Sequence, residues 1–248
     1  MAHILLYSLL SVLLVSLISL AGIFTISIKA AKLKKILIYL ISFSAGALFG
    51  DVFIHLLPEL SENSFSTNSS ILLLSGIVIF FVLEKIIHWQ HCHMPITKDH
   101  IHSFAYTNLF GDALHNFIDG LIIAASYIAS IPVGLATALA VVLHEIPQEI
   151  GDFGVLLHAG FTKSKALTLN FITALSAVLG TLIALWLNGT IENLQLILLP
   201  IAAGGFIYIA GSDLIPELHK ETNLKKSFIQ LLCFLAGILI MFALLFLE

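Results

Sequence analysis

Hydrophobic residues occur along this chain in long runs that short polar connections separate. An apolar run of roughly 18 residues or more can cross the ~30 Å hydrocarbon core of a bilayer as a helix. We identify eight such runs, at residues 4–28, 36–58, 71–88, 104–129, 132–160, 165–187, 195–218 and 227–247. The pattern therefore predicts an all-α integral membrane protein with eight transmembrane helices in a single domain, residues 1–248.

The composition strengthens this interpretation. Hydrophobic residues make up 59% of the chain, charged residues only 10%, and the mean hydropathy is +1.05. A water-facing surface needs far more charge than this. The chain has no glycine-rich loop for nucleotide phosphates and no basic patch, so we expect a lipid bilayer and no nucleic acid among its partners.

The basic residues predict the orientation of the helices. All 11 are Lys, and they fall in alternate connections, at 29–35, 85–98, 163–165 and 220–226. Because basic connections are retained on the cytoplasmic side, these four should face the cytoplasm. We therefore place the chain in the plasma (cytoplasmic) membrane with both termini outside.

Two parts of the chain match each other at a constant offset. Residues 45–47 (Ala-Gly-Ala) and 55–60 (His-Leu-Leu-Pro-Glu-Leu) correspond to 203–205 (Ala-Gly-Gly) and 213–218 (Asp-Leu-Ile-Pro-Glu-Leu). The second and seventh helices, which carry them, run in opposite directions, so a 3+2+3 inverted repeat around the fourth and fifth helices is expected. Such repeats are typical of transporters. The alternative is a chance recurrence of small residues in apolar helices.

Polar and ionisable residues interrupt the fourth and fifth runs. An acid at a helix centre costs roughly 2.5 to 3.5 kcal/mol, and neither run contains a Lys or Arg that could neutralise it. Imidazole and carboxylate ligands suit zinc and other divalent first-row metals. We therefore predict a metal site near the midplane of the bilayer, built from His115, Asn116, Asp119, His144, Glu145, Gln148 and Glu149.

Pro147 lies within this polar stretch. A proline has no N–H, so the carbonyl of Leu143 loses its helical partner and the helix should bend beside His144. Irregular backbone at this depth is tolerated mainly where it lines a cavity or is covered by protein. A single buried His or Asn is explained as well by an ordinary interhelical hydrogen bond, but that alternative leaves the several acids unexplained.

Further ionisable residues lie toward the ends of the two repeat-related helices. Asp51 and His55 lie toward the outer end of the second helix, and Asp213 toward the inner end of the seventh. They are candidates for the entrance and exit of a cation path, with ordinary helix-end polarity as the alternative. In the second helix, Gly46 and Gly50 form a small-xxx-small pair that should allow another helix to approach closely.

The sequence motifs resemble those of the ZIP family of divalent-metal transporters. The matching stretches are HNFxDG at 115–120, HEIPxExGDF at 144–153, DxxxHLLPE at 51–59 and SDLIPEL at 212–218. The resemblance implies zinc as the transported substrate, with Fe²⁺, Mn²⁺ and Cd²⁺ as further candidates. It also implies a homodimer, in which helices one, four, five and six of each chain move against the other four.

The same resemblance implies a division of the site. One metal subsite would use His115, Asp119, His144 and Gln148, and a neighbouring subsite would use Asn116, Glu145 and Glu149, with Asp119 and Gln148 shared by both. Asn170 matches a position where some relatives supply an acid. Gln148 departs from the family branch, which usually has His there, and an amide is a weaker ligand than an imidazole. The choice of metal is therefore open.

A His-rich cytoplasmic loop is expected at residues 89–103. It contains His91, His93, His100 and His102. Short His-rich tracts bind metals, and the resemblance implies that this loop receives the metal as it leaves the membrane.

Two other functions compete with transport. Residues 144–148 approximate the HExxH signature of an intramembrane zinc metalloprotease, but the second His is Gln148 and Pro147 would distort the helix. A metal sensor that uses only the His-rich loop leaves the midplane acids without a role. We therefore predict a transporter that carries divalent cations toward the cytoplasm by alternating access, with no catalytic step.

Overall fold

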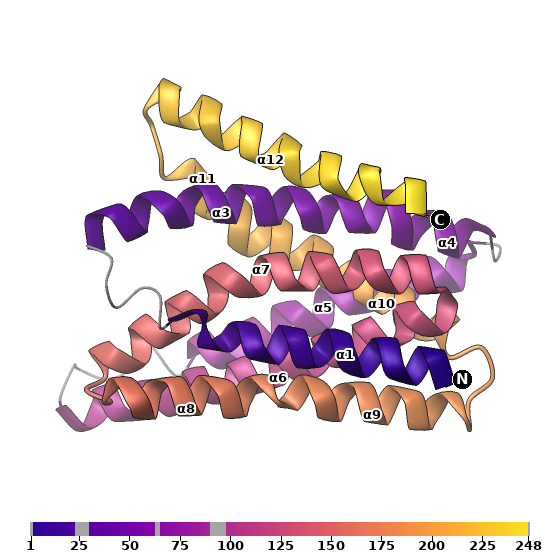
Figure 1. Ribbon diagram of the computed structural model, residues 1–248, viewed down its shortest axis with the longest axis horizontal. Coiled ribbons are helices and arrows are strands. Elements are labelled where there is room, and N and C mark those ends of the chain that lie inside the picture. Colours follow the sequence, from indigo (N-terminus) through magenta and orange to yellow (C-terminus); the bar gives the residue numbers. More distant parts are fainter. Residues whose placement is uncertain (1, 23–29, 63–64, 90–97, 248) are drawn as a thin grey trace.

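The computed structural model describes residues 2–22, 30–62, 65–89 and 98–247, and every regular element within these ranges is a helix. The long helices run side by side along the longest axis of the molecule (Figure 1). The labelled N and C ends lie at the same end of this assembly (Figure 1).

The elements follow one another in this order. The first is α1 (Ala2–Ile18), which ends in the 3-10 turn η1 (Ser19–Ala21), and the next is α3 (Ala30–Gly50), which continues as the π-helix η2 (Asp51–Leu56) and α4 (Leu57–Glu62). Then come α5 (Thr67–Trp89), α6 (Lys98–Ala129), α7 (Ile131–His158), α8 (Lys163–Ala174) and α9 (Ser176–Asn188). The chain ends with α10 (Gln195–Tyr208), which continues as the π-helix η3 (Ile209–Leu214) and α11 (Ile215–His219), and with α12 (Leu224–Leu244) and the 3-10 turn η4 (Leu245–Leu247).

Seven helical segments in the described ranges are long and apolar enough to cross a membrane. They correspond to seven of the eight expected runs, and the chain is an integral membrane protein. The eighth, α6, does not qualify, because Asp112, His115, Asn116 and Asp119 lower the hydropathy of its central turns. It nevertheless lies alongside the others (Figure 1).

The helices pack as two groups. We call α1, α6, α7, α8 and α9 the bundle, because α6 packs against the other four. We call α3, α5, α10 and α12, with the short segments that continue α3 and α10, the frame, because α12 packs along α3 and α5 along α10. The groups meet where α7 lies on α3 and α6 on α10, around the buried side chains of Val12, Leu48, Ile123, Val141 and Phe206.

Close helix contacts within the frame occur at glycines. A Cβ atom added to Gly46 of α3 would lie 2.0 Å from the carbonyl oxygen of Phe234 in α12, and one added to Gly237 of α12 would lie 2.1 Å from that of Phe43. No side chain larger than hydrogen fits at either position. The close approach expected at Gly46 is therefore confirmed.

The pair α10 and α5 repeats this contact. A Cβ atom added to Gly204 of α10 would lie 2.0 Å from the carbonyl oxygen of Leu73 in α5, and one added to Gly76 of α5 would lie 2.2 Å from that of Ile201 in α10. Each residue has a counterpart in the α3–α12 pair. Positions 43 and 46 of α3 correspond to 201 and 204 of α10, at an offset of 158. Positions 73 and 76 of α5 correspond to 234 and 237 of α12, at an offset of 161. The two helix pairs thus share one packing pattern.

The two π-helical segments are related by the same offset of 158 residues. Asp51–Leu56 and Ile209–Leu214 differ by 158 positions at both ends, and each is closed by the equivalent backbone bond, from Leu57 to Val52 and from Ile215 to Ala210. A proline follows directly in both cases. Because Pro cannot donate to the carbonyl four residues back, it favours a local departure from the α-helix, and π-helical turns occur frequently at functional sites.

Candidate metal centre

Four side chains from α6 and α7 meet at the interface of the bundle and the frame. His115, Asp119, His144 and Glu145 each offer a ligand atom, and these atoms lie within 4.8 Å of one another. The His144 Nε2 atom is 3.2 Å from Asp119 Oδ2 and 3.5 Å from Glu145 Oε1. The His115 Nε2 atom is 3.3 Å from His144 Nε2 and 3.5 Å from Glu145 Oε1.

The carboxylates of this four-residue group are buried and lack hydrogen bonds. Asp119 and Glu145 are 0% and 1% exposed, and none of their carboxylate oxygens has a hydrogen-bond partner among the described residues. Two adjacent buried acids in this state are costly unless a cation compensates them. Within the described part of the chain, the nearest basic groups are the two imidazoles, so the donor set suits a bound cation.

The imidazole of His144 is oriented for metal binding. Its Nδ1 atom lies 3.2 Å from the carbonyl oxygen of Ala140, one helical turn earlier. A proton on Nδ1 leaves Nε2 with its lone pair toward the other three ligand atoms, as in many protein metal sites. Phe206 packs against the His144 ring and Phe80 against the His115 ring, with centroid distances of 5.9 and 6.0 Å.

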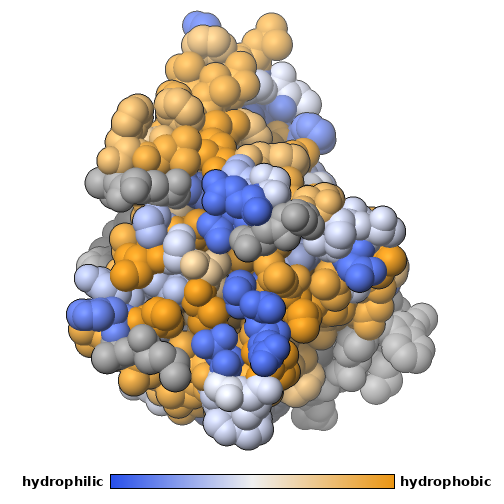
Figure 2. All heavy atoms as spheres, turned by 90° about the vertical axis from the view of Figure 1, so that its right-hand side faces the viewer, coloured by the Kyte–Doolittle hydropathy of each residue, from blue (hydrophilic) through white to orange (hydrophobic). Residues whose placement is uncertain are grey.

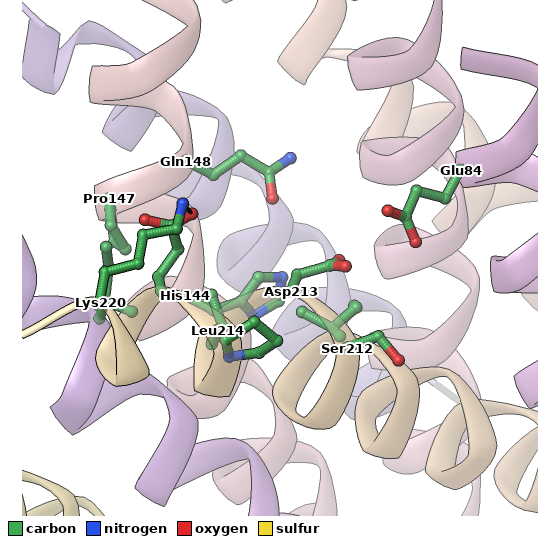
Figure 3. Close-up of a pocket in the computed structure, with 12 residues that line it drawn as sticks. Glu84, His144, Pro147, Gln148, Ser212, Asp213, Leu214 and Lys220 are labelled. Carbon is green, nitrogen blue, oxygen red and sulfur yellow. Dashed lines mark hydrogen bonds and ion pairs between the residues drawn. The ribbon is translucent and has the colours of Figure 1, made fainter. Parts of the chain in front are cut away.

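A cavity of about 470 Å³ adjoins this group (Figure 3). His144, Pro147 and Gln148 of α7 line one side, and the wall continues through Asp213 to Lys220, beyond the end of α11. Of the two expected surroundings of Pro147, a cavity or a cover of protein, the structure shows a cavity. The cavity extends from His144 toward the end of the molecule that is opposite to the two termini.

Glu84 of α5 is a lining residue that the sequence patterns did not single out. It lines the large cavity and a second one of about 100 Å³ that reaches His115, and Asp213 lines both as well. The two carboxylates point toward each other (Figure 3). The hydroxyl of Tyr208 donates a hydrogen bond to Glu84. An acid near the end of an apolar helix was the only available signal for Glu84.

Comparisons with known proteins decide the family. The family model described as ZIP zinc transporter matches residues 2–104 and 93–245. The chain belongs to the ZIP zinc transporter family. Zinc transporter ZIP13 of Danio rerio is 33% identical, over 85% of this chain and 75% of that protein. Zinc transporter ZIP13 of Pongo abelii is 35% identical (82% and 65%), and zinc transporter YKE4 of Saccharomyces cerevisiae is 34% identical (82% and 69%).

Membership of the ZIP family confirms the resemblance of the motifs. These relatives are named as transporters and not as enzymes. The metalloprotease alternative is therefore not favoured, in agreement with the Gln at position 148 and with Pro147 inside α7.

The remaining predicted ligands lie around Asp112, which was not among them. Asn116 donates to Asp112 Oδ1 at 2.9 Å, and the side chain of Gln148 lies near the Asp112 carboxylate. Glu149 is 1% exposed and its carboxylate oxygens lack hydrogen-bond partners among the described residues, while Asn170 donates to its backbone carbonyl at 3.2 Å. Together, these residues extend the polar interior of the bundle beyond the four-residue group.

The geometry divides the residues of this ZIP protein differently from the division that the motifs implied. Glu145 lies in the four-residue group with His115 and His144, although the motifs assigned it to the neighbouring subsite. Gln148, which the motifs assigned to both subsites, lies near Asp112 and lines the cavity. The rotation of α7 relative to α6 decides this, and sequence spacing does not reveal it.

The outer half of the predicted path is closed. Asp51 and His55 of η2 are 0% and 2% exposed. Asp51 accepts a hydrogen bond from Thr137 at 3.1 Å, and His55 Nε2 lies 2.9 Å from the carbonyl oxygen of Met241. Hydrophilic side chains nevertheless form a band across the face at which the two termini lie (Figure 2).

The His-rich loop was predicted over residues 89–103, and residues 90–97 of it lie outside the described part of the chain. The helix α6 begins at Lys98, within the predicted loop. His100 and His102 belong to the first turns of α6, and their side chains are outside the described set, as are His91 and His93. Metal binding by this segment stays a prediction.

Proposed function

We propose that this ZIP protein carries divalent metal cations, zinc foremost, across the membrane toward the cytoplasm. The observation that carries the proposal is the buried group of His115, Asp119, His144 and Glu145, whose acids lack hydrogen bonds and which opens into a cavity. A transported ion needs ligands that bind it and a path by which it leaves. Both are present at the same place.

The ligand chemistry favours zinc. Two imidazoles and two carboxylates within 4.8 Å can complete a tetrahedral zinc site without another donor. Fe²⁺, Mn²⁺ and Cd²⁺ remain competitors, because geometry and ligand type, more than raw affinity, set selectivity in such sites. We also propose that Asn116, Gln148 and Glu149, with Asn170 beside them, form a neighbouring oxygen-rich subsite.

The proposed topology has eight crossings, with α6 as the eighth, and the Lys-bearing connections in the cytoplasm. The connections that carry Lys163 and Lys220 lie at the end of the molecule opposite to the two termini (Figure 1). In this orientation both termini are outside the plasma membrane, and the large cavity faces inward. We refer to this arrangement as the inward-open state.

Alternating access is supported by the pattern shared by the two halves of the frame. We propose a 3+2+3 inverted repeat in which the bundle moves against the frame. The equivalent π-helical segments differ in exposure: Asp51 and His55 of η2 are buried, whereas Ser212 of η3 is exposed and Asp213 lines the cavity. If η2 became exposed and η3 became buried, the outer side would open. A homodimer, which the motifs imply, stays a prediction.

Zinc uptake by proteoliposomes tests the proposed function. The purified full-length chain should take up zinc, and a His115→Ala, His144→Ala double variant should not exceed protein-free liposomes. His219→Ala, an exposed histidine at the end of α11, is the matched control and should transport like the parent. Equal uptake by the double variant would refute the site. Zinc binding by the parent without uptake would support a sensor instead.

A further inference from the structure

Among the described residues, α7 is hydrogen-bonded to the frame at Ser44 and at Asp51. The hydroxyl of Ser44 in α3 donates to the carbonyl oxygen of Leu143 at 2.5 Å. The hydroxyl of Thr137 in α7 donates to the Asp51 carboxylate of η2 at 3.1 Å. Any motion of the bundle relative to the frame must break these bonds or move both partners together.

The Ser44 bond has a cause in the covalent structure of α7. Pro147 has no N–H, so the carbonyl of Leu143 cannot receive the usual helical hydrogen bond. A buried carbonyl without a donor is costly, and the Ser44 hydroxyl supplies one from the neighbouring helix. Leu143 directly precedes His144, so this bond attaches the metal-binding part of α7 to the frame.

Ser44 has a second acceptor within its own helix. Its Oγ atom is 2.8 Å from the carbonyl oxygen of Leu40, one turn earlier in α3. A hydroxyl has a single proton, so when α7 moves away the proton can be donated to Leu40 and the buried donor stays paired. Leu143 then loses its donor beside the cavity that His144 and Pro147 line, where water can replace it.

The bond has no equivalent in the other half of the frame. The residue 158 positions after Ser44 is Ala202 of α10, which has no hydroxyl. If the two halves exchange environments, the outward-open state therefore lacks this hydrogen bond. The bond stabilises one state of the cycle only.

We propose that Ser44 is a positioning residue that holds α7 at Leu143 against α3 in the inward-open state and releases it, by donating to Leu40, when the bundle moves. The inference rests on the proposed transport function and adds a determinant of its conformational equilibrium. A hydrogen bond of ordinary strength corresponds to about a fivefold change in the ratio of the two states.

Cysteine labelling measures that ratio. Leu214 of η3 lines the inner cavity, and its counterpart Leu56 of η2 is 0% exposed. In a Cys92→Ser, Cys233→Ser background, Leu214→Cys should react with a membrane-impermeant maleimide from the Lys-bearing side, and Leu56→Cys from the opposite side. Ser44→Ala should lower the ratio of the inner to the outer labelling rate about fivefold.

Matched variants separate this effect from general damage to α3. Ser44→Thr keeps the hydroxyl and should restore the parent ratio. Ser42→Ala removes another buried hydroxyl of α3, which donates to Ile38 in the same helix at 2.9 Å, and should leave the ratio unchanged. An unchanged ratio in Ser44→Ala, or an equal fall in Ser42→Ala, overturns the proposal.

Pro147→Ala provides a second test. Alanine restores an N–H that can donate to the Leu143 carbonyl, so Ser44→Ala in this background should no longer change the labelling ratio. This double variant should fold even if Ser44→Ala alone does not, because Leu143 is paired again. A full Ser44→Ala effect in the Pro147→Ala background contradicts the mechanism.

Zinc uptake, measured in parallel, separates the two proposals. Labelling reports the conformation whether or not metal moves. A parent protein that moves no zinc refutes the proposed function, while its labelling ratio still responds to Ser44→Ala if the positioning role is correct. A parent that transports zinc but shows no Ser44→Ala effect on labelling refutes the positioning role alone.

Discussion

The Nε2 atom of His144 lies 3.2 Å from Asp119 Oδ2 on the neighbouring helix, and Nδ1 of the same imidazole faces the carbonyl oxygen of Ala140. The Nε2 lone pair of His144 on α7 and the carboxylate of Asp119 on α6 thus point to the same place. A divalent cation there would be bound by both helices, so bound metal should stabilise the contact of α6 with α7.

Neutralisation of Asp119 should weaken metal binding. Asp119→Asn keeps the shape of the side chain but removes a charge that receives no hydrogen bond from the described residues. We expect zinc affinity to fall at least about tenfold, since even changes in residues that only support a ligand cost that much. Isothermal titration of the purified protein measures it. Glu192→Gln, at an exposed acid in the connection between α9 and α10, should leave the affinity unchanged. Equal affinities for Asp119→Asn and the parent would exclude Asp119 as a ligand.

Gln148 should influence the choice of metal. It lies on the cavity wall next to His144, and Gln148→His replaces an amide oxygen by an imidazole. Imidazole favours zinc over manganese more strongly than an amide does. Competition between the two metals in proteoliposome uptake should therefore shift toward zinc in Gln148→His. The same order and ratio of preference in both proteins would show that Gln148 does not contact the ion.

Asp213 should affect the rate of metal release more than the binding of metal. It lines both cavities but lies outside the four-residue group. Asp213→Asn removes a negative charge that attracts the cation along its exit path. We expect a lower maximal zinc uptake rate and an unchanged zinc affinity in titrations. A loss of affinity as large as that of Asp119→Asn would instead make Asp213 a ligand.

The bundle should depend on the absence of a side chain at Gly120. An added Cβ atom would lie 1.9 Å from the carbonyl oxygen of Ala177 in α9, so Gly120→Ala must push the two helices apart. Overpacking of this kind costs about 1–3 kcal/mol. A thermal unfolding midpoint measured in detergent should fall.

Gly154 provides the control for this prediction. Apart from the adjoining backbone of α7, no atom of the described residues lies within 4 Å of a Cβ added there. Gly154→Ala should therefore raise the midpoint slightly or leave it unchanged, because Ala favours a helix more than Gly does. A similar fall in both variants would mean that the loss is not due to the contact with α9.

The sequence alone determined those features that depend on local chemistry. Hydrophobic run length predicts a membrane span, and seven of the expected spans qualify in the structure, while the polar turns of α6 make the eighth less apolar. The freed carbonyl of Leu143 follows from the missing N–H of Pro147. The candidate metal ligands of α6 and α7 were predicted for a similar reason, since buried acids without basic partners need compensation, and four of them lie close together in the structure.

Only the tertiary structure decided which side chains meet. Glu145 joins His115 and Asp119, Glu84 reaches the cavity from α5, and Ser44 pairs with Leu143. Each of these contacts depends on the rotation and separation of two helices, which the packing of side chains at glycines such as Gly120 sets. A hydrophobic pattern records which face of a helix is buried, but it does not record which residue of another helix lies opposite.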